Sequence, residues 1–275
     1  MKFKDIKGYL IAIDLDGTLV QNFDDYDKKS FEVLKEVAKN NYIVISTGRP
    51  YRSSKYFYDL LELNTPFVNY NGALVHNPND LNFKKRMIHI NKESLFKFIK
   101  EKGHILHNIF CEIEDDIYVQ RYDEEIEPYL HTNGGTVHAG NLEETLPGNP
   151  NGAILFVKKG CEQELEDYVN NHYNNEVRLR YWFTTNVIVC ELYNPLTSKA
   201  NALKIICDYY NIDKSKTIAI GDGHNDIEML EFCEIGVAMG NSHKDLIPHA
   251  TYITDSVQDS GVYNFFMKDM DDKYS

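Results

Sequence analysis

The sequence has few of the features that mark a membrane or nucleic-acid-binding protein. No apolar stretch approaches the roughly 20 residues of a membrane span, and the first apolar run, Tyr9–Ile13, is too short for a signal-peptide core. Acidic residues outnumber basic ones by 42 to 29, and the net charge of −13 argues against a nucleic-acid backbone or an anionic membrane as partner. We therefore expect a cytoplasmic protein that binds neither, although a few local cations could still hold a phosphorylated metabolite.

Cysteine is also scarce, and no two cysteines form a Cys-x-x-Cys pair. An odd, scattered set predicts buried free thiols in a reducing compartment rather than disulfides. The cysteines are Cys111, Cys161, Cys190, Cys207 and Cys233. With 275 residues, 43% of them hydrophobic, the chain is long enough for one large domain or two medium ones.

Two aspartates follow the first apolar run directly. Tyr9–Ile13 predicts a strand buried on both faces, and Asp14 and Asp16 stand at its end, before the turn residues Gly17 and Thr18. Two carboxylates in such a place repel each other and lose hydration unless a proton or a cation compensates. A hard divalent ion such as Mg²⁺ is one solution, and an acidic strand end open to water is the alternative.

The next elements predict a parallel sheet. Ser30–Asn40 has the apolar spacing of a helix, and Tyr42–Ile45 is a second buried strand, so the three elements form a βαβ unit. The carboxyl ends of its strands then meet at one edge of the sheet, where α/β folds bind ligands. Thr47 and Gly48 follow the second strand and could present backbone N–H groups to an anion, although an ordinary strand-to-helix turn fits them as well.

The pattern changes after the turn residues His76–Asp80. Residues 82–189 predict an inserted α+β domain on an antiparallel sheet, whereas residues 1–81 and 190–275 belong to the parallel core. Two strand–helix–strand–strand series make up the insertion, and they begin with strands at Phe83–His89 and Ala153–Val157.

The parallel pattern resumes after Pro195. Ser198 predicts the N-cap of a helix that runs to about Tyr210, and Lys199 lies in its first turn, where the helix dipole disfavours a cation. This placement hints at a local anion, with a generic surface lysine as the alternative. Thr217–Ile220 predicts another buried strand, and the acids and glycines of Gly221–Asp226 come directly after it.

These motifs occur in one order and would meet at one edge of one sheet. In this arrangement the chain resembles the haloacid dehalogenase superfamily of phosphohydrolases, and within it the Cof-like branch with a large inserted cap. The family's four motifs are similar, in order, to Asp14–Thr18, Ser46–Arg49, Lys199 and Gly221–Asp226. Asn71–Ala73 also resembles a Cof-branch feature, although a plain hairpin turn explains Asn71 and Gly72 equally well. The resemblance implies an α/β fold, with a Rossmann-like parallel-sheet core and an inserted α+β cap at 82–189.

The resemblance implies catalytic roles for two aspartates and a metal-binding role for a third. Asp14 would be the nucleophile that attacks phosphorus and forms an aspartyl-phosphate. Asp16 would be the general acid and base. Asp14, the backbone carbonyl of Asp16, and Asp222 would bind Mg²⁺, which neutralises charge on the phosphate ester.

The resemblance also implies a phosphate site. Thr47, Gly48, Lys199 and Asn225 would hold the phosphoryl oxygens, and Asp226 would orient Lys199 or a metal-bound water. One departure from the family's pattern is Ala200, because glycine commonly follows the lysine.

The leading hypothesis is a cytoplasmic, Mg²⁺-dependent phosphatase of a small phosphorylated metabolite, with a sugar phosphate as the favoured substrate and a monomer or weak dimer as the expected state. A phosphotransferase or phosphomutase that uses the same aspartyl-phosphate is one alternative, and a phosphoryl-receiver module without turnover is another. Asp16 and the large insertion argue against a receiver, which needs neither a general acid nor a cap. Two residues stay open: Trp182 fits core packing or sugar stacking, and His224 fits a solvent-facing or a catalytic role.

Overall fold

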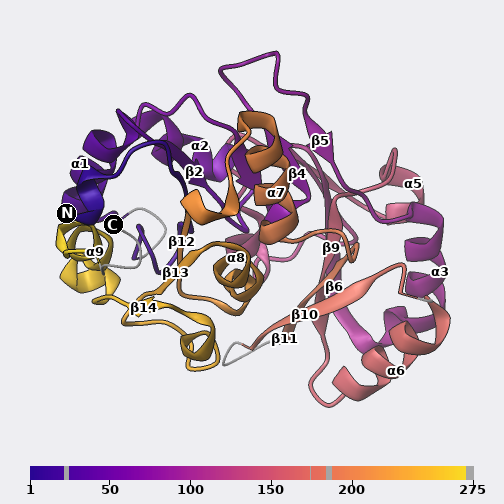
Figure 1. Cartoon of the computed structure of the whole chain (residues 1–275). Helices are drawn as coiled ribbons and strands as arrows, with labels where there is room; N and C mark the ends of the chain where they lie inside the picture. Colours follow the sequence, from indigo (N-terminus) through magenta and orange to yellow (C-terminus); the bar gives the residue numbers. More distant parts are fainter. Residues whose placement is uncertain (22–24, 174, 184–187, 271–275) are drawn as a thin grey trace. The chain divides into compact units, whose positions relative to one another are not determined.

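The chain divides into two compact units. The computed structural model describes residues 1–21, 25–173, 175–183 and 188–270, and Figure 1 shows its helices and strands. The first unit consists of Met1–Arg49, Lys55–Arg86 and Ser198–Ser275, and the second of Pro50–Ser54 and Met87–Thr197. Within the described ranges, none of the helices has the length and apolarity needed to cross a bilayer. All five cysteines are free thiols, and every one except the half-buried Cys161 is buried.

A five-stranded parallel sheet is the centre of the first unit. Its strand order is β14-β13-β12-β1-β2, and all neighbours are parallel. The strands are β1 (Leu10–Ile13), β2 (Tyr42–Ile45), β12 (Thr217–Gly221), β13 (Ile235–Ala238) and β14 (Tyr252–Ile253). In β1, Ile13 pairs with Ile45 of β2 on one side and with Ile220 of β12 on the other. The loops that follow these three strands therefore leave the sheet side by side, at one edge.

Helices bury both faces of this sheet. The helices of the first unit are α1 (Lys28–Ala38), α2 (Tyr51–Leu60, whose first residues belong to the second unit), α7 (Lys199–Tyr210), α8 (Ile227–Phe232) and α9 (Gly261–Met267). Leu203 of α7 and Met229 of α8 share one apolar cluster with Leu10 of β1. Helices α1 and α9 lie together near the chain ends (Figure 1). As the sequence predicts, Ser198 caps α7, and its hydroxyl accepts the N–H of Asn201 at 3.1 Å.

A small sheet comes after β2 in the chain, and it corrects one prediction. Its order is β3-β4-β5, with β3 (Phe67–Asn69) antiparallel to β4 (Leu74–His76), and β5 is only Arg86–Met87. The strand expected over Phe83–His89 is therefore wrong for most of its length. Phe83 is buried in the apolar cluster that also holds α7, and its ring lies 4.9 Å from that of Tyr209. Core packing, rather than strand pairing, fixes this residue.

The second unit is built on a six-stranded sheet of order β10-β11-β9-β6-β7-β8. Its strands are β6 (Leu106–Ile113), β7 (Asp116–Val119), β8 (Thr136–Ala139), β9 (Gly152–Val157), β10 (Arg178–Phe183) and β11 (Ile188–Tyr193). The predicted antiparallel sheet is correct except at one edge, because β8 runs parallel to β7. The sequence did not predict β8, whose residues Thr-Val-His-Ala carry a weak apolar pattern.

Helices cover both faces of this second sheet. The longer ones are α3 (Lys92–Lys102) and α6 (Glu162–His172), and the short ones are α4 (Glu127–Leu130) and α5 (Leu142–Thr145). Phe98 of α3 and Leu165 of α6 share a cluster with Leu155 of β9. On the other face, Leu130 of α4 packs with Phe156 of the same strand. Alternate residues of β9 thus serve two separate clusters.

Candidate active site

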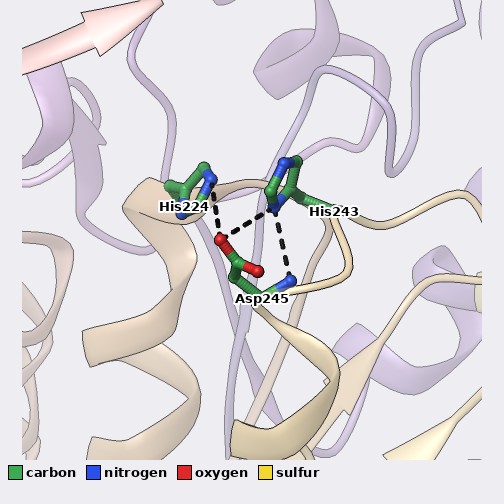
Figure 2. A group of neighbouring side chains, drawn as sticks. All are labelled: His224, His243 and Asp245. Atoms are coloured by element: carbon green, nitrogen blue, oxygen red, sulfur yellow. Dashed lines mark hydrogen bonds and ion pairs between the residues drawn. The ribbon is translucent and has the colours of Figure 1, made fainter.

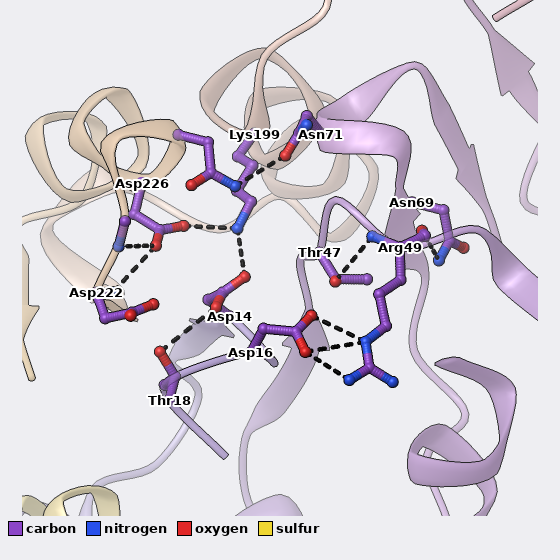
Figure 3. Close-up of polar contacts among 12 residues, drawn as sticks. Asp14, Asp16, Thr18, Thr47, Arg49, Asn69, Asn71, Lys199, Asp222 and Asp226 are labelled. Atoms are coloured by element: carbon purple, nitrogen blue, oxygen red, sulfur yellow. Dashed lines mark hydrogen bonds and ion pairs between the residues drawn. The ribbon is translucent and has the colours of Figure 1, made fainter. Parts of the chain in front are cut away.

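A fully buried lysine joins the edge of the parallel sheet to the helix that follows the insertion. The Lys199 ammonium lies 2.5 Å from Asp14 Oδ1 and 2.6 Å from Asp226 Oδ1, and its side chain has no exposed surface (Figure 3). Asp14 comes directly after β1, and Asp226 belongs to the short turn before α8. The sequence therefore brings three distant segments to one ion-pair network, as the order of the motifs predicts.

The charges in this network are not balanced. Burial raises the pKa of Asp14 well above its usual value, and the nearby carboxylates raise it further against the opposing effect of Lys199. Burial and the charge of Asp226 likewise raise the pKa of Asp222 to about 7. For Lys199, burial alone would lower the pKa, but Asp14 and Asp226 outweigh it and raise the pKa to about 12. One ammonium thus faces more negative charge than it can neutralise.

Asp226 has a structural task besides its ion pair. Its second oxygen accepts the backbone N–H groups of Asp222 and Gly223, at 3.0 and 2.9 Å. A methyl group at Gly221 would overlap the Asp226 side chain. Both oxygens of Asp226 are therefore used within the protein, one to hold Lys199 and the other to fix the loop that carries Asp222.

The Asp222 carboxylate packs against the loop after β1. A Cβ atom built on Gly17 would overlap it, and Gly17 has a φ of +75° that favours glycine on its own account. The carboxylate consequently lies against Gly17, the residue after Asp16. This placement brings Asp222 to the loop that carries Asp16.

The Asp16 side chain has a partner that the sequence did not reveal. Two nitrogens of the Arg49 guanidinium donate to the Asp16 carboxylate, with Nε 2.8 Å from Oδ2 and Nη2 2.5 Å from Oδ1 (Figure 3). The Arg49 side chain is 5% exposed and that of Asp16 is 51% exposed. Arg49 belongs to the second motif, but its partner lies 33 residues away in the sequence. A local sequence pattern does not predict a contact between residues so far apart.

The predicted phosphate-site residues surround this network. Thr47 is fully buried, and its hydroxyl accepts the Arg49 N–H at 3.1 Å. The Asn225 amide donates to Asn71 Oδ1 at 2.9 Å. A Cβ atom on Gly48 would lie 3.2 Å from the same Asn71 oxygen. Asn71 therefore does more than close the connection between β3 and β4, because it contacts the loops after β2 and β12.

Gly72 completes this contact between segments. It has a φ of +102°, and a Cβ atom there would overlap the backbone carbonyl of Ser198. The turn can thus approach the start of α7, where Lys199 is the first residue. Asn71 and Gly72 thus form the turn of an antiparallel pair, as one interpretation expects, and they also contact Asn225 and Ser198, so a role in the site stays a prediction.

The two residues that the sequence left open have different outcomes. The His224 side chain is 53% exposed and lies beside Asp245 and His243, outside the buried network. Trp182 belongs to β10, but its side chain lies outside the part of the structure that is described.

The site has oxygen donors that fit a hard divalent cation. Asp14, Asp222 and Asp226 each offer an oxygen within 4.8 Å of the others. Asp226 already accepts hydrogen bonds from Lys199 and from two backbone N–H groups, so Asp14 and Asp222 are the more available side-chain donors. Burial first, and then the neighbouring carboxylates, raise the pKa values of Asp14 and Asp222, and a bound cation would favour the ionised form of both. An all-oxygen, anionic donor set is what Mg²⁺ prefers.

Comparison with known proteins places the chain in a family. Residues 11–266 match the model of the haloacid dehalogenase-like hydrolases. The chain belongs to this family. The predicted resemblance to haloacid dehalogenase phosphohydrolases of the Cof-like type is thereby confirmed, and phosphatases among its relatives identify the chain as a phosphatase.

Three similar proteins illustrate the match. The 5-amino-6-(5-phospho-D-ribitylamino)uracil phosphatase YitU of Bacillus subtilis is 32% identical over 263 residues, which cover 95% of this chain and 97% of that protein. YcsE of the same organism carries the same enzyme name and is 26% identical, with 94% of each chain covered. A haloacid dehalogenase-like hydrolase from Bacteroides thetaiotaomicron has a TM-score of 0.80 at 22% identity, covering 94% of this chain and 98% of its own. The last comparison confirms the predicted fold class.

We predict that Gly17→Ala raises the Mg²⁺ concentration needed for half-maximal phosphatase activity by about 10-fold or more. The new methyl group would displace the Asp222 carboxylate, and changes beside metal ligands typically cost about 10–100-fold in metal affinity. Gly8→Ala is the matched control, since Gly8 has a similar φ of +72° and its Cβ atom would lie 3.9 Å from the nearest other group, Lys216 Nζ. A Mg²⁺ titration of both variants measures the effect, and equal Mg²⁺ requirements would contradict the placement of Asp222.

Proposed function

We propose that this protein is a Mg²⁺-dependent phosphatase that hydrolyses a small sugar-like phosphate monoester through an aspartyl-phosphate on Asp14. The observation that supports this most strongly is the buried Lys199, held between Asp14 and Asp226 beside the further carboxylate of Asp222. A buried lysine between carboxylates suits a site where a dianionic phosphoryl group meets an attacking carboxylate. Positive charge there must offset the negative charge of the phosphoryl group and of the carboxylate.

Asp14 is the proposed nucleophile. Its carboxylate oxygen attacks phosphorus, the bond from phosphorus to the substrate oxygen breaks, and Asp14 carries the phosphoryl group. Lys199 contacts Oδ1 of Asp14 at 2.5 Å, a position from which its ammonium can also meet a phosphoryl oxygen. Burial raises the pKa of Asp14, and the charge of Lys199 opposes that rise and so favours the ionised carboxylate. Ionisation is required, since a protonated carboxyl group is a poor nucleophile.

Asp16 is the proposed general acid and base. It gives a proton to the departing alkoxide in the first half-reaction and takes one from the attacking water in the second, which regenerates Asp14 and releases phosphate. The Asp16 carboxylate is half-exposed, so it can meet both a leaving group and a water molecule. Arg49 is the positioning residue, because its nearly buried guanidinium holds the Asp16 carboxylate from two nitrogens.

The remaining residues serve binding. Asp14, Asp222 and the Asp16 carbonyl would hold Mg²⁺, which supplies charge neutralisation at the phosphoryl group. Thr47, Gly48 and Asn225 line the loops after β2 and β12, where their hydroxyl, backbone and amide donors can meet phosphoryl oxygens. Asp226 keeps Lys199 in place.

The substrate class is inferred from the relatives. YitU and YcsE are named for 5-amino-6-(5-phospho-D-ribitylamino)uracil, whose phosphate is esterified to a ribityl chain. A phosphate monoester on a sugar or a sugar alcohol is therefore the class we favour. We assign the choice among such substrates to the insertion at 82–189, because the residues of the parallel-sheet edge are occupied with the phosphoryl group.

Replacing the nucleophile tests the reaction. We expect Asp14→Asn to lower phosphate release by a factor on the order of 10³ or more, because the amide cannot form the aspartyl-phosphate. Asp16→Asn should lower it by about 10²–10⁴-fold through loss of the general acid. Release of inorganic phosphate with water as the acceptor, followed over hexose, pentose and polyol phosphates, measures both.

Wild-type turnover by Asp14→Asn would overturn the nucleophile assignment. Transfer of the phosphoryl group to a second sugar, with little free phosphate, would favour the phosphotransferase or mutase alternative. Stable phosphorylation of wild-type Asp14 with no release would favour a receiver.

Metal removal provides a separate test. We expect chelation with EDTA to abolish activity and added Mg²⁺ to restore it. Mg²⁺ should also raise the melting temperature, since a ligand that binds only the folded state stabilises it, and Asp222→Asn should greatly reduce this shift. Undiminished activity in EDTA, or an equal shift in Asp222→Asn, would contradict the proposed metal site.

A further inference from the structure

A second group of metal-ligating side chains includes a residue of the loop that carries Asp222, and the proposed phosphatase mechanism gives it no role. It consists of His224, His243 and Asp245 (Figure 2). Asp245 Oδ2 lies 3.8 Å from His224 Nε2 and 3.6 Å from His243 Nδ1, and the two imidazole rings are 4.0 Å apart. We propose that these three side chains bind one divalent transition-metal ion of the zinc class, at a site separate from the Mg²⁺ site.

The spacing of the donor atoms fits one ion. A Zn²⁺ ion binds imidazole nitrogen and carboxylate oxygen at about 2.0–2.2 Å, so neighbouring ligands around it stand roughly 3.3 Å apart in a tetrahedron. The two nitrogen-to-oxygen distances here, 3.6 and 3.8 Å, are only slightly longer. Small side-chain rotations would bring the three atoms onto one ion. Figure 2 shows both rings turned toward the same carboxylate.

One contact at this cluster would have to give way to a metal. The backbone N–H of Asp245 points at His243 Nδ1 from 3.3 Å, and this ring nitrogen has a single in-plane lone pair, which faces that donor. The contact is long for a hydrogen bond, so a rotation of the imidazole ring that turns this lone pair toward an ion loses little.

The donor types separate this cluster from the carboxylate site. Two imidazoles and one carboxylate favour a borderline ion such as Zn²⁺, whereas all-oxygen sets favour Mg²⁺. The side chains of His224, His243 and Asp245 are 53%, 46% and 54% exposed, which leaves room for water in the remaining coordination position. Among the described residues, no other cluster of three such donors includes a histidine.

An ion here would join two loops of the first unit. His224 follows β12, in the loop that carries Asp222, whereas His243 and Asp245 follow β13. The two loops are already in contact, because the backbone N–H of His243 donates to the backbone carbonyl of Asp222 at 2.8 Å. Binding at the cluster should therefore stabilise the folded state as well as occupy the site.

The test is a Zn²⁺ titration of the full chain in saturating Mg²⁺, with a chromophoric chelator as competitor. We expect wild-type protein to bind one equivalent of Zn²⁺. His243→Ala and Asp245→Asn should each weaken that binding by at least the roughly 10-fold that changes around metal ligands cost. Zn²⁺ should raise the melting temperature of the wild type but not of these variants.

The matched control is His249→Ala. His249 also pairs with an acidic side chain on the surface, 2.7 Å from Glu231, but this pair has no third donor in the clusters formed by the described residues. His249→Ala should keep wild-type affinity for Zn²⁺. Equal Zn²⁺ affinity in the wild type, His243→Ala and Asp245→Asn would overturn the proposal. Loss of Zn²⁺ binding only in Asp222→Asn would also overturn it, since the ion would then occupy the carboxylate site.

Discussion

The ion pairs of Lys199 are the interaction on which the rest of the site depends. Its ammonium is fully buried and reaches two carboxylates, one of them 185 residues away in the sequence. A buried charge without its partner costs about 3–5 kcal/mol, so the start of α7, the end of β1 and the turn before α8 must stay together. The same lysine places a positive charge where a phosphoryl group would bind. In the proposed mechanism, one side chain therefore contributes both to the stability of the first unit and to binding of the phosphoryl group.

The buried carboxylates of Asp14 and Asp222, beside the single ammonium of Lys199, are the basis of the proposed metal site. Burial raises the pKa values of Asp14 and Asp222, and a divalent cation would relieve that cost by binding to both. Glycine makes the close approach possible, since Gly17 admits the Asp222 carboxylate and Gly221 admits the Asp226 side chain. The parallel strands bring the loops of the site together, because β1, β2 and β12 all end at one edge of the sheet.

Much of this could be predicted from the sequence, because apolar runs followed by acids and glycines mark buried strands with functional loops. Contacts between such loops could not. Arg49 binds Asp16, which lies 33 residues away in the sequence, and Asn225 donates to Asn71, which lies 154 residues away. Only the folded edge of the sheet brings these side chains together. Local pattern also failed at Phe83, where apolar residues suggested a strand but the ring packs against Tyr209.

Lys199→Met tests the central claim most directly, through melting temperature measured from about pH 5 to pH 8 with and without Mg²⁺. Asp222 has a pKa raised to about 7 and that of Asp14 is also raised, and a carboxyl group whose folded pKa is raised destabilises the fold as pH rises toward that value. Without the ammonium both pKa values rise further, so the stability that the variant loses relative to wild type should be constant at the acidic end of this range and should grow as pH rises through about 7, where wild-type Asp222 ionises. Mg²⁺ should restore part of it. A constant difference across this range, unchanged by Mg²⁺, would contradict the account.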